Sequence, residues 1–140
     1  MKKILILSDT HSFIDEKILK YVRLADEVWH AGDIGDLAVT DEIKKLKPLR
    51  AVYGNIDNDK ARMEFPLNNR FFCENVEVWI THIGGYPGKY NQAIRTEIQN
   101  LFTGSNRDLS SLAKIFFFGV VDNQKCGGIK DMVKVFANFG

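Results

Sequence analysis

The sequence predicts an α/β fold built on a parallel sheet. Short apolar runs alternate with segments of helical spacing along the first half of the chain, and each run leads into a polar loop. A strand-helix-strand-helix-strand order implies parallel strands joined by right-handed crossovers. With 140 residues, of which 45% are apolar and 26% charged, the sequence is expected to form one globular domain, residues 1–140.

Three strands are predicted in the first half of the chain. Ile4–Ser8 is apolar without alternation, as expected of a strand buried on both faces. The other two are predicted at Glu27–His30 and Leu49–Tyr53.

Two helices are predicted between these strands. Asp15–Ala25 has apolar residues at helical spacing and acidic residues in its first turn. Thr40–Leu46 is expected to be capped by Thr40, with Ile43 and Leu46 facing inward and Pro48 closing the helix.

The pattern changes in the second half. Val76–Thr81 alternates, which predicts a strand with one buried and one partly solvated face, paired with Phe71–Cys73 through a turn at Glu74-Asn75. The remaining predicted elements are a helix at Asn91–Phe102, a strand at Ile115–Phe118 and a C-terminal amphipathic helix carrying Ile129, Met132, Val133 and Phe136.

Composition excludes several classes of protein. A formal net charge of +1 gives no sign of a nucleic-acid or membrane surface. Cys73 and Cys126 have no CxxC spacing, so a disulfide framework or zinc knuckle is not expected and a cytoplasmic location fits. The N-terminal apolar run of four residues, Ile4–Leu7, is too short for a signal peptide or membrane span. The oligomeric state is left open.

Four predicted strands end in side chains that bind metals. These ends are Asp9-Thr10-His11, His30-Ala31-Gly32-Asp33, Gly54-Asn55-Ile56-Asp57 and Thr81-His82-Ile83-Gly84-Gly85. The carboxyl ends of parallel strands lie together and form a ligand-binding crevice. Taken singly, Asp9 and His11 could cap a helix, and Asp33 and Asn55 could be turn residues. Together, they predict a shared metal site.

The donor types indicate the chemistry. Carboxylate, amide and imidazole ligands without a usable thiolate suit divalent Mn, Fe, Zn or Mg. A carboxylate between two such ions can bridge them at about 3.5–4 Å, a separation used for in-line displacement at phosphorus. No Ser, Cys or His nucleophile paired with a base is evident near these ligands, so a metal-bound hydroxide is the expected attacking group.

The motifs D-x-H, G-D, G-N and H-x-G, in this order after strands, resemble the calcineurin-like metallophosphoesterases, in particular the small single-domain bacterial and archaeal phosphodiesterases. The resemblance covers residues 1–119 and implies a four-layer α/β/β/α sandwich with two divalent ions. Mn²⁺ is the favoured ion, and Fe²⁺, Zn²⁺, Ni²⁺ and Mg²⁺ are alternatives. It implies that Asp9 and His11 hold the first ion, that Asp33 bridges, and that Asn55 and His82 hold the second. Asp33, Asn55 and His82 are the implied catalytic residues.

Two positions depart from the family pattern. The fifth family motif, G-H-x-H, is replaced by Gly119-Val120-Val121-Asp122. Asp122 could offer an oxygen ligand, but Val120 cannot coordinate, so the second ion is expected to be under-occupied and the activity weakened. The C-terminal part is therefore divergent or truncated, or it follows a frame change in the gene. Ile56 stands where many phosphatases of the superfamily have a histidine that protonates the leaving group.

Two neighbouring residues and two function classes complete the prediction. His30 is expected to support the ligands or pack behind them, and Asp57 either orients ligands or is solvated. The first function class is a metal-dependent phosphoesterase acting on a phosphoester substrate. The alternative is a non-catalytic scaffold of this fold that binds a protein partner, as the retromer subunit of this fold does.

Overall fold

The computed structural model describes residues 2–73, 76–83, 85–86, 89–90, 92–93, 95–96, 116–118 and 135–139. The helices are α1 (Glu16–Leu24), α2 (Ala38–Lys44) and α3 (Asp59–Glu64). The strands are β1 (Lys2–Leu7), β2 (Glu27–His30), β3 (Leu49–Ala51), β4 (Asn68–Cys73), β5 (Val76–Thr81), β6 (Gly85–Tyr86), β7 (Lys89–Tyr90), β8 (Phe116–Phe118) and β9 (Val135–Phe139).

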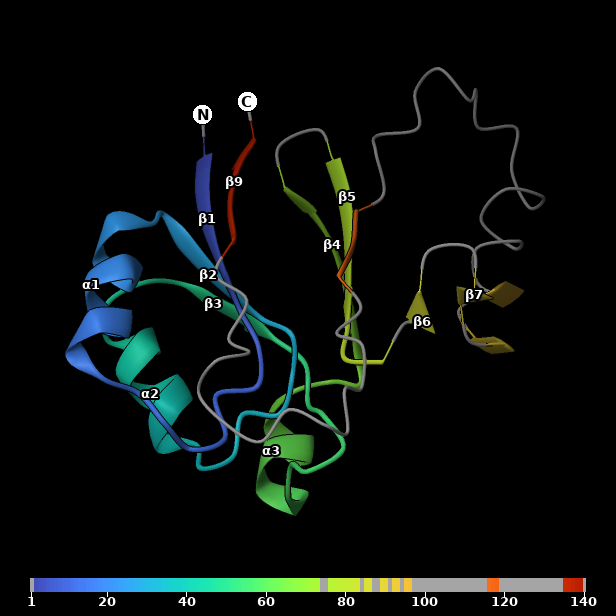
Figure 1. The fold of residues 1–140 in the computed structure, drawn as a ribbon, viewed down its shortest axis with the longest axis horizontal. Coiled ribbons are helices and arrows are strands. Elements are labelled where there is room, and N and C mark those ends of the chain that lie inside the picture. The colour runs from blue at the N-terminus through green and yellow to red at the C-terminus, as the bar shows by residue number, and fades with distance from the viewer. Residues whose placement is uncertain are drawn as a thin grey trace.

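Two sheets face each other, with α1 and α2 on the outer side of the first (Figure 1). The first sheet has the strand order β3-β2-β1-β9 and the second has the order β4-β5-β8. β1, β2 and β3 run parallel, as predicted, and β2 has the predicted bounds. β8 runs parallel to β5, and β4 pairs with β5 as the predicted antiparallel hairpin.

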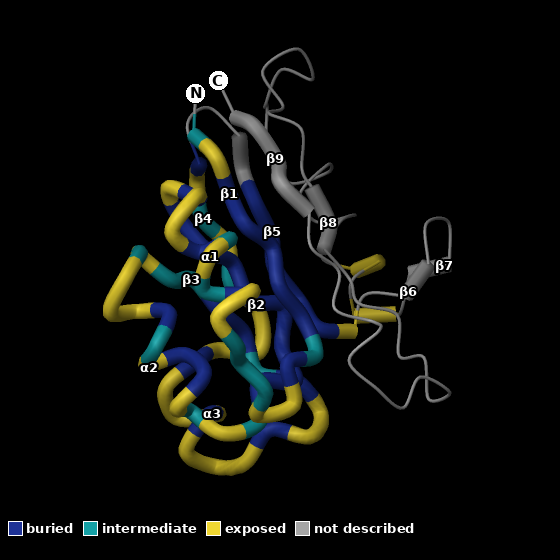
Figure 2. Tube along the Cα trace, turned by 60° about the vertical axis from the view of Figure 1, so that its left-hand side comes forward, coloured by how far each residue is buried: buried dark blue, intermediate teal, exposed yellow. Residues whose placement is uncertain are grey.

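The alternation of β1 divides the buried core into two clusters. Leu5 and Leu7 pack towards the helices, whereas Ile4 and Ile6 pack between the sheets. The helix-side cluster is completed by Ile18, Val22, Ala25, Val28, Ile34, Val39, Ile43, Ala51 and Phe65. The sheet-to-sheet cluster is completed by Trp29, Ala31, Val52, Cys73, Val78 and Ile80. Figure 2 shows this burial along β1, β2 and β5.

The chain therefore has a mixed α/β architecture, and its described residues build three of the four layers that the resemblance implies. Residues 92–93 and 95–96 of the predicted outer helix Asn91–Phe102 are helical, and the rest of that helix lies outside the described residues. None of the helices in the described part of the chain has the length and apolar character that a membrane span requires.

The first helix matches its prediction and the second does not. Asp15 caps α1 by accepting a hydrogen bond from the backbone N–H of Ile18 at 2.8 Å. The prediction that Thr40 caps the second helix was wrong, because the Asp36 carboxylate accepts the Ala38 N–H at 2.9 Å and α2 begins earlier. Leu46 is 39% exposed beyond the end of α2, so its predicted inward orientation was also wrong.

The prediction of a partly solvated face on β5 was wrong. Trp79 is only 3% exposed and Thr81 is also buried. The reason lies in the neighbouring strand, since the Trp79 indole N–H donates to the Asn68 side-chain oxygen at 3.2 Å and the Arg70 guanidinium covers the Trp79 ring. β4 therefore covers a ring that a simple alternation of strand faces would expose.

The predicted C-terminal helix was wrong where the structure describes it. Val135 and Phe136 belong to β9, which pairs antiparallel with β1 in the register Ile6↔Val135 (Figure 1). The Val-Phe-Ala-Asn-Phe segment is rich in strand-forming residues, and the free edge of β1 supplies its hydrogen-bonding partner. Ile129, Met132, Val133 and the predicted turn at Glu74-Asn75 lie outside the described residues.

Candidate metal centre

The loop after β1 carries Asp9 and His11 in a backbone conformation that side chains rarely adopt. The φ angles of Asp9, His11 and Ser12 are 55°, 47° and 70°, all in the left-handed region. Three hydrogen bonds fix the loop against the one after β2, from the N–H groups of these residues to the carbonyls of Gly32, Asp33 and Ile34. Because α1 is capped by Asp15, Asp9 and His11 are not a capping pair for that helix.

Asp33 lies at the centre of the cluster. It is buried and also left-handed, with φ 55°. A Cβ atom at Gly54 would lie 2.1 Å from Asp33 Oδ1, so only glycine at position 54 leaves room for the carboxylate. The same oxygen accepts the Ile56 N–H at 3.2 Å. The loop after β3 therefore closes around Asp33.

His82 reaches this cluster from the second sheet. It is buried at the end of β5, and its Nδ1 lies 2.8 Å from the Ala31 carbonyl oxygen. A carbonyl only accepts, so Nδ1 carries the proton and Nε2 faces the cluster. Nε2 lies 3.0 Å from Asn55 Oδ1 and 3.2 Å from Asp33 Oδ1.

The two oxygens of Asp33 face different pairs of residues. Oδ1 faces His82 and the loop that carries Asn55, whereas Oδ2 lies 3.6 Å from His11 Nε2. His11 Nε2 is in turn 3.7 Å from Asp9 Oδ1. The structure thus brings together all five residues that the sequence predicts as ligands, with Asp33 between an Asp9–His11 pair and an Asn55–His82 pair.

The donor set fits a divalent ion. Two ligand atoms at about 2.1 Å from one ion and at right angles to each other lie about 3 Å apart, close to the separations measured here. Ligand atoms of Asp9, Asp33 and His82 all lie within 4.8 Å of one another. Within the described part of the chain, the ion pairs of Asp9 and Asp33 are formed with histidines.

The pKa shifts reflect this crowding. Burial opposes ionisation of Asp33, but its contacts with His82 and the Ile56 N–H outweigh burial and hold the pKa of Asp33 below its usual value. Burial also opposes protonation of His82, yet Asp33 and the Ala31 carbonyl raise the pKa of His82 overall. Burial raises the pKa of Asp9, with the Ser8 hydroxyl acting in the opposite direction. Asp33 and His82 therefore stabilise each other's charged forms, and a metal ion bound at His82 Nε2 would compete with protonation of that nitrogen.

His30 lies behind the ligand loops. Its Nδ1 accepts the Gly32 N–H at 3.1 Å, so Nε2 carries the proton and donates to Thr10 Oγ1 at 2.9 Å. The Thr10 hydroxyl in turn donates a hydrogen bond to the Ile34 carbonyl oxygen at 3.0 Å. Full burial lowers the pKa of His30 to about 4, which keeps the ring neutral. His30 thus connects the loops after β1 and β2.

Asp57 fixes two ligand loops through the backbone. Its buried carboxylate accepts the N–H groups of Ile34, Gly35 and Gly54 at 3.2, 2.9 and 2.7 Å. Of the two readings left open by the sequence, the buried, loop-orienting position is the one observed. Asp122 lies outside the described residues.

Sequence reasoning missed two residues around the site, Thr10 and Arg62. Arg62 donates from Nε to the Asp57 carbonyl at 2.9 Å. It stands on α3, a helix of six residues that was not predicted although Asn58 marks its start by accepting the Ala61 N–H. The asparagine cap followed by Asp59 was the available signal.

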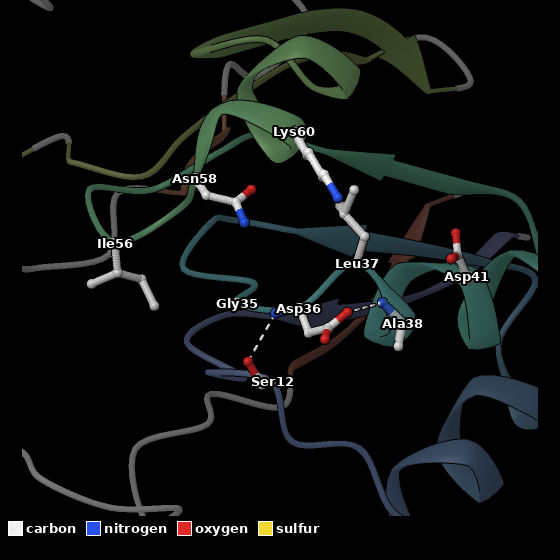
Figure 3. Close-up of a pocket in the computed structure, with 9 residues that line it drawn as sticks. All are labelled: Ser12, Gly35, Asp36, Leu37, Ala38, Asp41, Ile56, Asn58 and Lys60. Carbon is white, nitrogen blue, oxygen red and sulfur yellow. Dashed lines mark hydrogen bonds between the residues drawn. The ribbon is translucent and has the colours of Figure 1, made fainter.

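Two cavities flank the loop that carries Asn55. The first, of about 700 Å³, has mixed polar and apolar walls and is shown in Figure 3. It is lined by Ser12, Gly35, Asp36, Leu37, Ala38, Asp41, Ile56, Asn58 and Lys60. The second, of about 370 Å³, is lined by Tyr53, Gly54, Asn55, Arg62, Leu67, Asn68, Trp79, Thr81, His82, Ile83 and Ala93. Two of the five candidate ligands, Asn55 and His82, line the second cavity.

Solved structures share this fold at low sequence identity. Vps29 from Chaetomium thermophilum is 14% identical with a TM-score of 0.60, and the alignment covers 85% of this chain and 61% of that one. The Thermotoga maritima protein TM1076 is 22% identical with a TM-score of 0.59, covering 84% and 72%. Vps29 from Entamoeba histolytica, complexed with zinc, is 15% identical with a TM-score of 0.52, covering 71% and 58%. The chain thus spans about three fifths of the Vps29 structures, and these likenesses show the fold alone.

No curated protein sequence matches the chain. The family model of the calcineurin-like phosphoesterase superfamily domain matches residues 1–105, a span that includes all five candidate ligands. The family resemblance predicted from the strand-end motifs is confirmed. This chain belongs to the calcineurin-like phosphoesterase superfamily.

Proposed function

We propose that the chain is a metal-dependent phosphoesterase that holds two divalent ions through Asp9, His11, Asp33, Asn55 and His82. The observation that carries the proposal is the position of Asp33, whose two oxygens face two different ligand pairs. One carboxylate between two ions, about 3.5–4 Å apart, is the arrangement used for displacement at phosphorus. Mn²⁺ is the favoured ion because carboxylate and amide oxygens outnumber imidazoles in the donor set.

The bound ions would lower the pKa of a water molecule and neutralise charge on the phosphoryl oxygens. The chain itself contributes orientation. The bond from His82 Nδ1 to the Ala31 carbonyl aims Nε2 at the cluster, and Asp57 keeps the loops of Asp33 and Asn55 together. Such fixed ligands need little rearrangement during the reaction.

Neighbouring hydroxyl groups support attack by water rather than by a side chain. The Ser8 hydroxyl donates to the Asp9 carboxylate, and the Thr10 hydroxyl donates to the Ile34 carbonyl. Both hydroxyl protons are therefore engaged, and the carboxylate beside Ser8 is itself a candidate metal ligand. Ile56 cannot protonate a leaving group, so esters with good leaving groups are the expected substrates.

We expect the activity to be weak. With Val120 in place of an imidazole, the ion beside Asn55 and His82 has three protein ligands including Asp33, and partial occupancy would lower the rate more than the stability of the fold. Asp122 could complete the shell of the ion beside Asp9 and His11. The Val120→His, Asp122→His double variant should then raise turnover, and unchanged turnover would argue against this register.

Metal content and hydrolysis together test the proposal. Purified protein supplied with Mn²⁺ should bind the ion and hydrolyse bis-p-nitrophenyl phosphate, with ¹⁸O from labelled water entering the phosphate product. Asp59→Asn, on the exposed first turn of α3, is the matched acidic control and should leave both readouts unchanged. A phosphorylated side chain trapped during turnover would contradict direct attack by water.

A second candidate is a non-catalytic scaffold that binds a protein partner. The observation that favours it is the missing G-H-x-H motif, since the sequence contains only His11, His30 and His82. Full-length protein that stays folded, retains no Mn²⁺ at millimolar supply and hydrolyses no phosphoester would support this candidate over the first.

A further inference from the structure

We propose that the apolar cavity beside Asn55 and His82 binds the aryl or alkyl ester group of the substrate, and that this chain therefore prefers phosphoesters with an apolar group. The inference rests on the proposed function and adds the class of substrate. It is carried by the position of the cavity, the chemistry of its walls and the placement of one cation.

The cavity is continuous with the candidate metal centre. Asn55 and His82 line it, and Asn55 Oδ1 and His82 Nε2 are the two atoms that face each other at 3.0 Å. A phosphoryl group bound at these ligands would thus lie at the wall of the cavity. Its volume of about 370 Å³ lies in the range of small-molecule sites.

The walls of the cavity are largely apolar. Tyr53, Leu67, Trp79 and Ile83 contribute rings and aliphatic side chains. Leu67 and Ile83 are 53% and 42% exposed, so both offer apolar surface that an occupant of the cavity could cover. Their position at the cavity, next to the candidate ligands, makes an ester group of the substrate the occupant that the geometry favours.

Arg62 is the one fully charged residue among the described residues that line this cavity. Its Nε–H donates to the Asp57 carbonyl, and its guanidinium lies 5.0 Å from the centre of the Tyr53 ring. These contacts hold a positive charge beside the apolar walls. A cavity that combines apolar walls with one fixed cation suits an anionic phosphoester that carries an apolar group.

The first cavity, on the other side of the Asn55 loop, carries a different set of charges. It is lined by the carboxylates of Asp36 and Asp41 together with Lys60, and by none of the five candidate ligands (Figure 3). The Asp36 carboxylate also accepts the Ala38 N–H. Among the described lining residues, a negatively charged phosphoester therefore meets two acids and one lysine on that side, but one arginine and no acid on the apolar side.

Binding of two simple anions tests the apolar cavity apart from turnover. In the presence of Mn²⁺, phenylphosphonate should bind about tenfold more tightly than methylphosphonate by isothermal titration, since an apolar pocket discriminates by roughly this factor. Leu67→Ser should reduce that preference at least about threefold. Met63→Ser, 88% exposed on α3 and outside the cavity, is the control and should keep it.

Hydrolysis supplies the second readout. The two esters bis-p-nitrophenyl phosphate and methyl p-nitrophenyl phosphate have the same leaving group, and the first should give the higher kcat/KM. Leu67→Ser should reduce this difference in kcat/KM by raising the KM for bis-p-nitrophenyl phosphate. Circular dichroism spectra that match wild type would show that Leu67→Ser is folded.

The outcomes separate the two proposals. If both phosphonates bind equally and both esters are hydrolysed equally, the cavity assignment is overturned while the phosphoesterase function stands. The same holds if Leu67→Ser and Met63→Ser both keep the full preference. If neither phosphonate binds and neither ester is hydrolysed at millimolar Mn²⁺, the proposed function and the inference fail together.

Discussion

The two ends of the parallel sheet each bury a carboxylate, and they treat it differently. At the start of β2, Glu27 accepts hydrogen bonds from Lys2, Arg50 and Trp29 at 2.9, 2.7 and 2.9 Å. Beyond the end of the same strand, Asp33 meets His82 and the Ile56 N–H instead. One carboxylate is neutralised by lysine and arginine of the protein, whereas the other is surrounded by ligand-type groups.

The difference shows what distinguishes a structural carboxylate from a candidate ligand. Burial opposes ionisation of both, and hydrogen bonds lower the pKa of both. Around Glu27, the positive charges of Lys2 and Arg50 balance the negative charge of the carboxylate. Around Asp33 a second acid, Asp9, is added, and the described ion pairs of both are with histidines, so a cation from solution would complete the balance.

The largest expected effect comes from removing the negative charge of Asp33 at the carboxyl end of the parallel sheet, which we call the ligand end. Asp33→Asn removes the charge that stands between the two ligand pairs while keeping the size of the side chain. We expect Mn²⁺ affinity to fall more than about 100-fold, beyond the 10- to 100-fold loss typical of groups that only support a metal ligand. Isothermal titration measures this, and an affinity within threefold of wild type would remove Asp33 from the site.

Acid should affect the two ends in different pH windows. His30 has a folded pKa of about 4, below its usual 6.5, so its neutral form stabilises the fold fully above pH 6.5. This contribution is lost as the pH falls towards 4, by up to about 3 kcal/mol. The pKa of Glu27 is lowered from 4.5, so its contribution is present above pH 4.5 and is lost only below it.

Urea denaturation between pH 7 and pH 3 separates these windows. His30→Gln should flatten the slope between pH 6.5 and 4, and Glu27→Gln should flatten it below pH 4.5. A His30→Gln variant that keeps the wild-type slope between pH 6.5 and 4.5 would show that His30 is not held neutral by burial.

Asp57→Asn asks whether the ligand end depends on its supporting carboxylate. The change removes the charge and one of the oxygens that accept the Ile34, Gly35 and Gly54 N–H groups. We expect a loss of about 2 kcal/mol in the free energy of unfolding and a 10- to 100-fold loss of Mn²⁺ affinity. Asp57→Asn that loses stability but keeps its affinity would limit Asp57 to a structural role.

The smallest effect is expected at the opposite end. Glu27→Gln leaves Lys2 and Arg50, both partly exposed, able to reach solvent, so the free energy of unfolding should fall by about 1 kcal/mol. Mn²⁺ affinity should not change, because Glu27 lies at the far end of β2. Weaker Mn²⁺ binding by Glu27→Gln would show that the Glu27 and Asp33 ends of the sheet are coupled, which would contradict their treatment as independent sites.

Local patterns in the sequence were sufficient for the parallel sheet and for the convergence of the five candidate ligands. Apolar runs locate β1 and β2, and the rule that parallel strands end at one edge brings Asp9 and Asp33 together. Non-local contacts explain what was missed. β9 becomes a strand by pairing with the edge of β1, and the burial of Trp79 depends on Asn68 and Arg70 from β4.

The supporting residues were the least predictable part of the site. The role of Asp57 arises from three N–H groups on two loops, and no spacing in the sequence announces such a contact. Arg62 was missed because a helix of six residues shows no full apolar period. Both residues owe their roles to the folded arrangement of the loops, which the identity of their sequence neighbours does not reveal.

The left-handed backbone of Asp9, His11, Ser12 and Asp33 also has an evolutionary consequence. Each such conformation costs a non-glycine residue about 1 kcal/mol, so the four positions oppose the stability of the fold as long as they keep their side chains. A lineage that did not need a metal site here would gain stability by substituting glycine at these positions. If related sequences retain aspartate and histidine at these positions, that retention would indicate selection for the site, and sequence comparison alone could detect it.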